Sequence, residues 1–200
     1  MITWARRHRI WTWAVAWGVT GIGFVTADIF SDPRRGPLWV GIVFGLAAWS
    51  AAGALTFHRV RLLHGVVVWA LAYLVALWLG AIWSVSFTRA PFVGGLLGWA
   101  VGGALGTLAS AYTSESRRLG VGPVLAAAAW GLSFFVGGYV ALVAGMILMQ
   151  AAKDVLAFLG QPASLTIGSG FGATLGGALA SALGMAARDA ITGPSELTES

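Results

Sequence analysis

The charged residues of this chain are confined to short clusters, and the long stretches between the clusters carry no charge. The 12 Lys and Arg and 7 Asp and Glu residues leave six uncharged stretches, which are 10–27, 36–58, 62–88, 90–114, 119–152 and 155–187. A helix needs about 20 mostly apolar residues to cross the hydrocarbon of a bilayer. In lipid every backbone polar group must be paired within the protein, which helices achieve. The pattern therefore predicts an all-α integral membrane protein.

We expect one transmembrane domain over residues 1–191, a bundle of about six helices, followed by a polar tail at 192–200. The expected spans are about 10–30, 37–57, 62–87, 91–112, 122–145 and 164–187. Composition agrees, because only 10% of the residues are charged, whereas soluble domains carry about 25%. Pro37, Pro91 and Pro123 lie at the starts of spans, where proline fits the first helical turn.

The stretch after the fifth span has two interpretations. Lys153 and Asp154 interrupt an apolar run, which is typical of a short helix lying at the membrane interface. We therefore expect a separate interfacial helix over about 147–159. The alternative is an extended or re-entrant end of the fifth span.

Glycine recurs at every fourth position in several spans, which predicts glycine-zipper packing between helices. The GxxxG-type positions are Gly41, Gly45 and Gly53, then Gly94, Gly98, Gly102 and Gly106, then Gly168, Gly172, Gly176 and Gly184. Glycines spaced in this way form a stripe along which another backbone can approach closely in lipid. The stripe at 94–106 suits a helix of another chain as readily as a helix of the same bundle.

The distribution of Lys and Arg predicts the orientation of the chain. With the N-terminus inside, eight basic residues lie on the cytoplasmic side and four on the other, as the positive-inside rule requires. We expect both termini in the cytoplasm and a bacterial-type inner or plasma membrane. The net charge of +5 is explained by these membrane-edge residues, and no nucleic-acid motif accompanies it.

Short motifs hint at three copies of a two-helix unit. The sequences AGAL at 52–55, GGAL at 102–105 and GGAL at 176–179 occupy the second, fourth and sixth spans. Trp17, Trp69 and Trp130 occupy the odd spans, and each precedes Gly or Ala and then Val or Leu. Chance matches are easy in a chain so rich in Gly, Ala and Leu, so the triplication is a hypothesis.

Candidate site residues are few. No charged residue lies near the middle of a span, where ionisable groups usually mark function, and the absence of cysteine excludes thiolate chemistry. We predict no catalytic or metal-ligating residues. The candidates for cofactor binding are His64, Trp69 and Trp99, although deep Trp residues also serve to fill space opposite glycine. Ser110, Ser133 and Ser181 are expected to hydrogen-bond between helices.

Two functions fit these features. The first is a non-catalytic subunit or scaffold of a membrane complex, which packs through glycine-lined faces against other membrane helices and holds a lipid, quinone or pigment. The alternative is a small transporter or channel for a neutral or apolar solute, without buried charged coupling residues. Catalysis ranks third, because no acid–base pair is recognisable.

Overall fold

The computed structural model describes residues 8–30, 38–57, 62–87, 89–113, 121–155 and 161–192. These residues form six helices and no strand. The helices are α2 (Arg9–Phe30), α3 (Leu38–Phe57), α4 (Leu62–Ser86), α5 (Pro91–Ala111), α6 (Val121–Val155) and α7 (Gln161–Thr192). The predicted tail after residue 192 lies outside the described residues.

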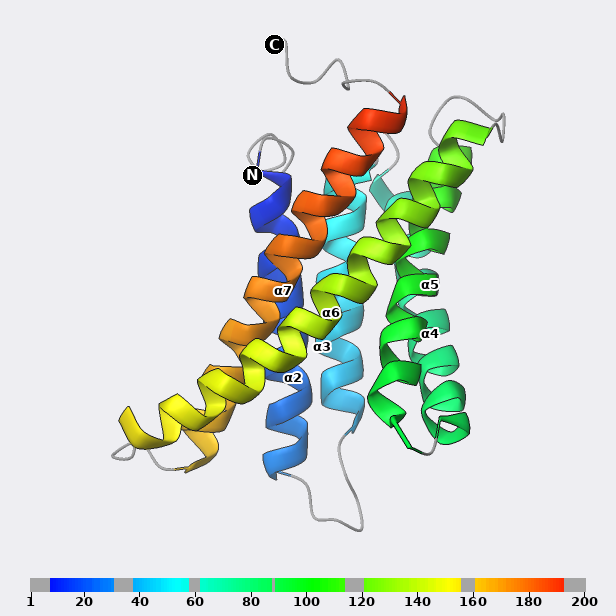
Figure 1. The fold of residues 1–200 in the computed structure, drawn as a ribbon. Helices are drawn as coiled ribbons and strands as arrows, with labels where there is room; N and C mark the ends of the chain where they lie inside the picture. Colours follow the sequence, from blue (N-terminus) through cyan, green and yellow to red (C-terminus); the bar gives the residue numbers. More distant parts are fainter. Residues whose placement is uncertain are drawn as a thin grey trace.

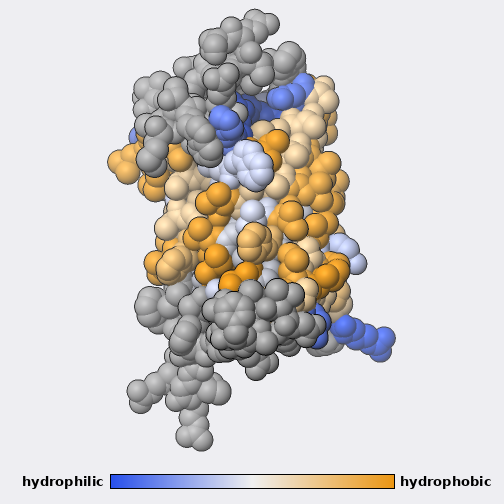
Figure 2. All heavy atoms as spheres, turned by 90° about the vertical axis from the view of Figure 1, so that its left-hand side faces the viewer, coloured by the Kyte–Doolittle hydropathy of each residue, from blue (hydrophilic) through white to orange (hydrophobic). Residues whose placement is uncertain are grey.

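Four of the helices are long and apolar enough to cross a membrane, consistent with an integral membrane protein. They are Leu62–Ser86, Phe92–Ala111, Val121–Ala152 and Leu165–Ile191. In α3 the stretch whose side chains are described, Gly41–Phe57, is also apolar but is shorter than these four helices. Large apolar side chains are exposed on these helices, and Figure 2 shows hydrophobic residues across the middle of one face, with hydrophilic ones nearer its ends. Such a surface suits lipid better than water.

The helices pack in chain order into a closed ring. Each helix contacts the helix before it and the helix after it, and α7 also packs against α2. The start of α2 and the end of α7 lie at the same end of the bundle, and α6 crosses the others at a marked tilt (Figure 1). The consecutive pairs α2–α3, α4–α5 and α6–α7 therefore follow one another around the ring, which is the arrangement that three two-helix units would form.

Glycines on α5 bring its backbone against the backbone of α4. A Cβ atom added at Gly94 would collide with the backbone of Trp83 and Ser84, and one at Gly98 with the backbone of Ala76 and Gly80. Any side chain at these positions would push the two helices apart. This α4–α5 contact lies within one chain, so the face is not free for a partner helix.

The contact between α6 and α7 uses glycine in the same way. A Cβ atom at Gly168 would meet the backbone of Met149, and one at Gly172 would meet the backbone of Gly145. Further along α7, a Cβ atom at Gly176 would collide with the carbonyl oxygen of Gly137. Glycine thus removes the atoms that would otherwise separate α6 from α7.

The glycines of α3 make room for rings instead of a backbone. A Cβ atom at Gly45 would collide with the Tyr73 ring, and one at Gly53 with the Trp69 ring, both on α4. The Cα atom of Gly41 lies close to Gly23 of α2. The three glycine sets therefore have different partners, although their spacing in the sequence is similar.

The expectation of a separate interfacial helix from residue 147 is wrong, because α6 continues without a break to Val155. Residues 146–152 are good helix formers with no Gly or Pro, and an adjacent Lys–Asp pair does not break a helix. The extended end is also packed, since Met149 lies against Gly168 of α7. The alternative interpretation, an extended end of the fifth span, is therefore the one that the structure has up to Val155. Residues 156–160 lie outside the described ranges.

Replacing Gly98 by Ala should lower the free energy of unfolding by about 1–3 kcal/mol, because the new methyl group meets rigid backbone. Gly172→Ala should behave alike. Gly122→Ala is the matched control, since nothing lies within 4 Å of its added Cβ atom. Denaturant titration in detergent micelles measures the difference. If all three variants unfold at the same midpoint, glycine does not set these helix contacts.

Candidate functional site: an aromatic core and a lateral pocket

The interior of the ring is filled by aromatic side chains from five of the six helices. We call this set the aromatic core, and its members are Trp13, Trp17, Trp49, Phe57, Trp69, Tyr73, Trp99, Trp130 and Phe134. Six of the Trp, Tyr and Phe side chains, those of residues 13, 49, 69, 73, 130 and 134, are fully buried. The core lies where a bundle of this topology would otherwise have a central path.

The aromatic core is built in two layers. Trp13, Trp69 and Trp130 come from α2, α4 and α6, and the ring centroid of Trp13 lies 4.9 Å from that of Trp69 and 6.2 Å from that of Trp130. One helical turn further on, Trp17, Tyr73 and Phe134 form the second layer, to which α3 adds Trp49. Edge-to-face contacts dominate, and they are the geometry that aromatic quadrupoles favour.

The layers show which tryptophans occupy equivalent positions on α2, α4 and α6. In α2, α4 and α6 a Trp is followed four residues later by another aromatic residue, in the sequences WAVAW at 13–17, WALAY at 69–73 and WGLSF at 130–134. Trp13 rather than Trp17 therefore corresponds to Trp69 and Trp130. Trp13, which the motifs considered in the sequence did not include, is fully buried. The shared four-residue spacing is the signal that would have placed it correctly.

The rings of three of these tryptophans pack against glycine, which leaves room for them because it has no side chain. Trp17 lies against Gly177, Trp69 lies against Gly53 and Gly106, and Trp130 lies against Gly184. This is the arrangement expected for deep tryptophans that fill space opposite glycine. Trp78 differs, since it is 65% exposed on the outer surface of α4.

Only some of the indole N–H groups in the core are paired. Trp13 Nε1 donates to Thr56 Oγ1 at 3.2 Å, and Trp69 Nε1 donates to Ser110 Oγ at 3.0 Å. The indole nitrogens of Trp17, Trp49 and Trp130 are buried and have no hydrogen-bond partner among the described residues. An unpaired buried donor lowers the stability of a protein by about 1–3 kcal/mol. These three indole N–H groups are therefore an unusual feature of the core.

The hydroxyl groups of the core mostly bond within their own helix. Ser133 donates to the Trp130 carbonyl oxygen, and Ser181 donates to the Gly177 carbonyl oxygen at 2.8 Å. The expectation that serines join helices fails for Ser133, because its hydroxyl reaches the carbonyl of the preceding turn. It holds for Ser181, whose hydroxyl also lies 3.4 Å from the carbonyl oxygen of Ile10 in α2, to which it donates. Ser110 does join two helices, as the acceptor for Trp69.

One end of the core is covered by a cation. The half-buried Arg188 of α7 places its guanidinium carbon 5.6 Å from the centroid of the Phe57 ring, a cation–π contact. Phe57 in turn stacks on Trp69 at 5.2 Å and meets Trp130 edge-on at 5.3 Å. Positive charge therefore lies beside the first aromatic layer, at the end of the bundle where α7 ends.

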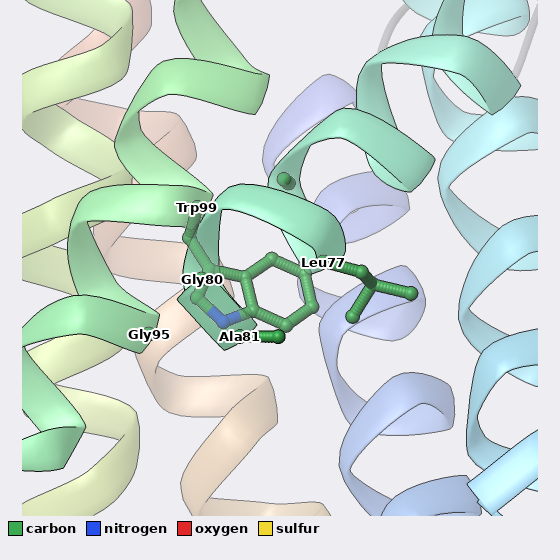
Figure 3. Close-up of a pocket in the computed structure, with 6 residues that line it drawn as sticks. Leu77, Gly80, Ala81, Gly95 and Trp99 are labelled. Atoms are coloured by element: carbon green, nitrogen blue, oxygen red, sulfur yellow. The ribbon is translucent and has the colours of Figure 1, made fainter. Parts of the chain in front are cut away.

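A pocket of about 290 Å³ opens on the surface between α4 and α5. Its walls are Ala76, Leu77, Gly80, Ala81, Gly95 and Trp99. In Figure 3 the Trp99 indole spreads across the pocket, with Leu77 and Ala81 beside it. Exposed Trp78 and Ile82 lie on the neighbouring outer surface of α4. The lining is apolar apart from the indole nitrogen of Trp99.

The three predicted cofactor candidates do not form one site. His64 is exposed near the start of α4, whereas Trp69 is fully buried. Trp99 is half-buried in the pocket wall, and Trp49 contacts both Trp69 and Trp99. No group of three or more His, Cys, Asp or Glu residues that could hold a metal ion occurs in the described part of the chain.

Comparisons with known proteins found no protein-family model, no curated protein and no solved structure that matches this chain.

The hydrogen bond from Trp69 to Ser110 should show as a coupling in a double-mutant cycle. Trp69→Phe and Ser110→Ala each remove it, so their combined effect on the free energy of unfolding should fall short of additivity by about 0.5–1.5 kcal/mol. Trp130→Phe is the control substitution. It makes the same change of ring, but the indole N–H group that it removes has no hydrogen-bond partner among the described residues. Strict additivity of the Trp69 and Ser110 substitutions would contradict the bond.

Proposed function

We propose that this protein is a six-span membrane protein, with helices packed through glycine-lined seams, that works without catalysing a reaction. It holds a lipophilic molecule in the pocket between α4 and α5 and acts as a subunit of a membrane complex. The observation that carries this proposal is the pocket itself, which is apolar and walled by a tryptophan. Ligand pockets are typically concave and mostly apolar, with few polar groups.

The glycine contacts determine where a partner helix can dock on the subunit that we propose. The stripes of α5 and α7 are occupied by α4 and α6 of the same chain, so partner helices have to dock elsewhere. The outer surface offers large exposed side chains on α4 and α6, among them Leu63, Val85, Leu132 and Ile147. Partners of apolar chemistry, either membrane helices or lipid, suit these faces.

Transport of a neutral or apolar solute is the second candidate. The closed ring of three helix pairs favours it, since repeated units around an axis are a common way to build a central path. The aromatic core fills the axis in this structure, so a solute would pass only after the rings move. Buried coupling carboxylates, which ion-driven carriers use, are not among the described core residues.

The composition of the protein as it is extracted from its own membrane tests the first proposal. We expect native mass spectrometry after gentle extraction to show a lipophilic molecule bound to the chain, within a larger complex. An absorbance spectrum of the same sample identifies a pigment or quinone. A colourless protein on its own, with no retained lipophile, would contradict the proposal and make liposome flux assays the next measurement.

The proposed topology can be tested with single cysteines, because the parent chain has none. Arg89 and Thr113 are exposed and lie just beyond opposite ends of α5. With both termini in the cytoplasm, a membrane-impermeant maleimide should label Arg89→Cys in intact cells and Thr113→Cys only after permeabilisation. Labelling of both from one side would mean that α5 does not span the bilayer. The reverse pattern would invert the orientation.

A further inference from the structure

Gly95 has open space in front of it, unlike the neighbouring glycines of α5. The only atom within 4 Å of an added Cβ is Ser84 Oγ, at 3.9 Å. An added Cβ at Gly80, on the opposite wall, would also make only ordinary contacts, the nearest at 3.4 Å to the Gly95 Cα atom. Helix packing therefore does not require glycine at these two positions. What the two glycines provide is the volume of the pocket.

The aromatic wall of the pocket is rigidly supported. The Trp99 ring centroid lies 4.9 Å from that of Trp49, 5.7 Å from that of Tyr73 and 5.9 Å from that of Trp17. These contacts fix the indole as a flat surface on which a second ring can stack. In Figure 3 its nitrogen lies between the labelled positions of Gly80 and Ala81.

The one polar side-chain atom in the pocket lining is the indole nitrogen of Trp99. An indole N–H can donate a hydrogen bond but cannot accept one. The indole nitrogens of Trp17 and Trp49 are buried, and neither residue lines the pocket. The pocket lining has no carboxylate, amide or hydroxyl side chain. A bound molecule is therefore selected for acceptor atoms, and its own donors would find no side-chain partner there.

We propose that this pocket binds the ring of a lipophilic quinone that enters from the bilayer. A quinone ring is planar, so it stacks on Trp99, and a carbonyl oxygen accepts a hydrogen bond from the Trp99 N–H group. The pocket volume of about 290 Å³ suits a substituted ring, since a dry cavity of about 150 Å³ is enough for benzene. The inference rests on the proposed function, because it names the lipophile that the pocket holds.

Chemistry favours the quinone over other membrane molecules. A hydrocarbon chain would fill the space but would leave the Trp99 N–H group without an acceptor. A quinol carries hydroxyl donors, for which the pocket walls offer no acceptor side chain. The oxidised ring is the form that matches both the flat wall and the donor.

The test measures retention of decylubiquinone by the full-length protein. The protein in detergent micelles is incubated with a concentration series of the quinone and separated from free quinone, and the bound quinone is then extracted and quantified. We expect saturable binding of about one quinone per chain. Gly95→Leu should weaken binding by about tenfold or more, because its side chain fills the pocket. Gly122→Leu, in which the new side chain starts in equally open space, should bind like the parent.

Two further comparisons test whether binding depends on a hydrogen bond or only on filling the pocket. The parent should prefer decylubiquinone over decylubiquinol by about twofold to tenfold, which is the range set by one hydrogen bond. Trp99→Phe keeps an aromatic wall but removes its N–H, so this preference should shrink. An equal affinity of the parent for both redox forms would overturn the donor argument.

The outcomes distinguish this inference from the proposed function. If dioleoylphosphatidylglycerol is retained in a Gly95-dependent manner and decylubiquinone is not, the quinone assignment is overturned and the lipophile pocket stands. If Gly95→Leu changes the retention of neither molecule, the pocket is not a binding site, and the proposed function loses the observation that carries it.

Discussion

The structure depends on the absence of Cβ atoms along the faces where helices meet. Helices in lipid gain little from hiding apolar surface from one another, so their association depends on dense van der Waals contact. Glycine supplies that contact in two ways here. On α5 and α7 it lets one backbone rest on another, and on α3 it leaves the space that the rings of Trp69 and Tyr73 occupy. The aromatic core fits inside the ring of helices because the glycines that its rings contact have no side chains.

The core is unusual in its polarity as well as in its size. Tryptophan brings a large apolar surface together with one donor that needs a partner. Thr56 and Ser110 satisfy two of these donors, and three others are left without an acceptor among the described residues. A chain that only needed volume could have used Phe or Leu. Among the tryptophans of the core, only Trp99 lines the pocket, whereas Trp17, Trp69 and Trp130 fill space opposite glycine.

Features that depend on local sequence were predictable, and features that depend on the meeting of distant helices were not. Uncharged runs predicted the helices, and four of them are long enough to span a membrane. The continuation of α6 past residue 147 was missed, because the contact of Met149 with Gly168 is invisible in a linear pattern. The pocket was missed for a related reason: Gly95 looks like its neighbours in the sequence, and only the position of α4 shows that it faces open space.

Closure of the ring by α2 and α7 has a consequence for how the protein is made. Trp17 rests on Gly177, so α2, the first of the described helices to be synthesised, obtains part of its packing surface from α7, the last of them. Until α7 is synthesised, this face of α2 lacks its partner. Each molecule therefore passes through a stage during synthesis in which five of the described helices surround a centre that α7 has not yet closed.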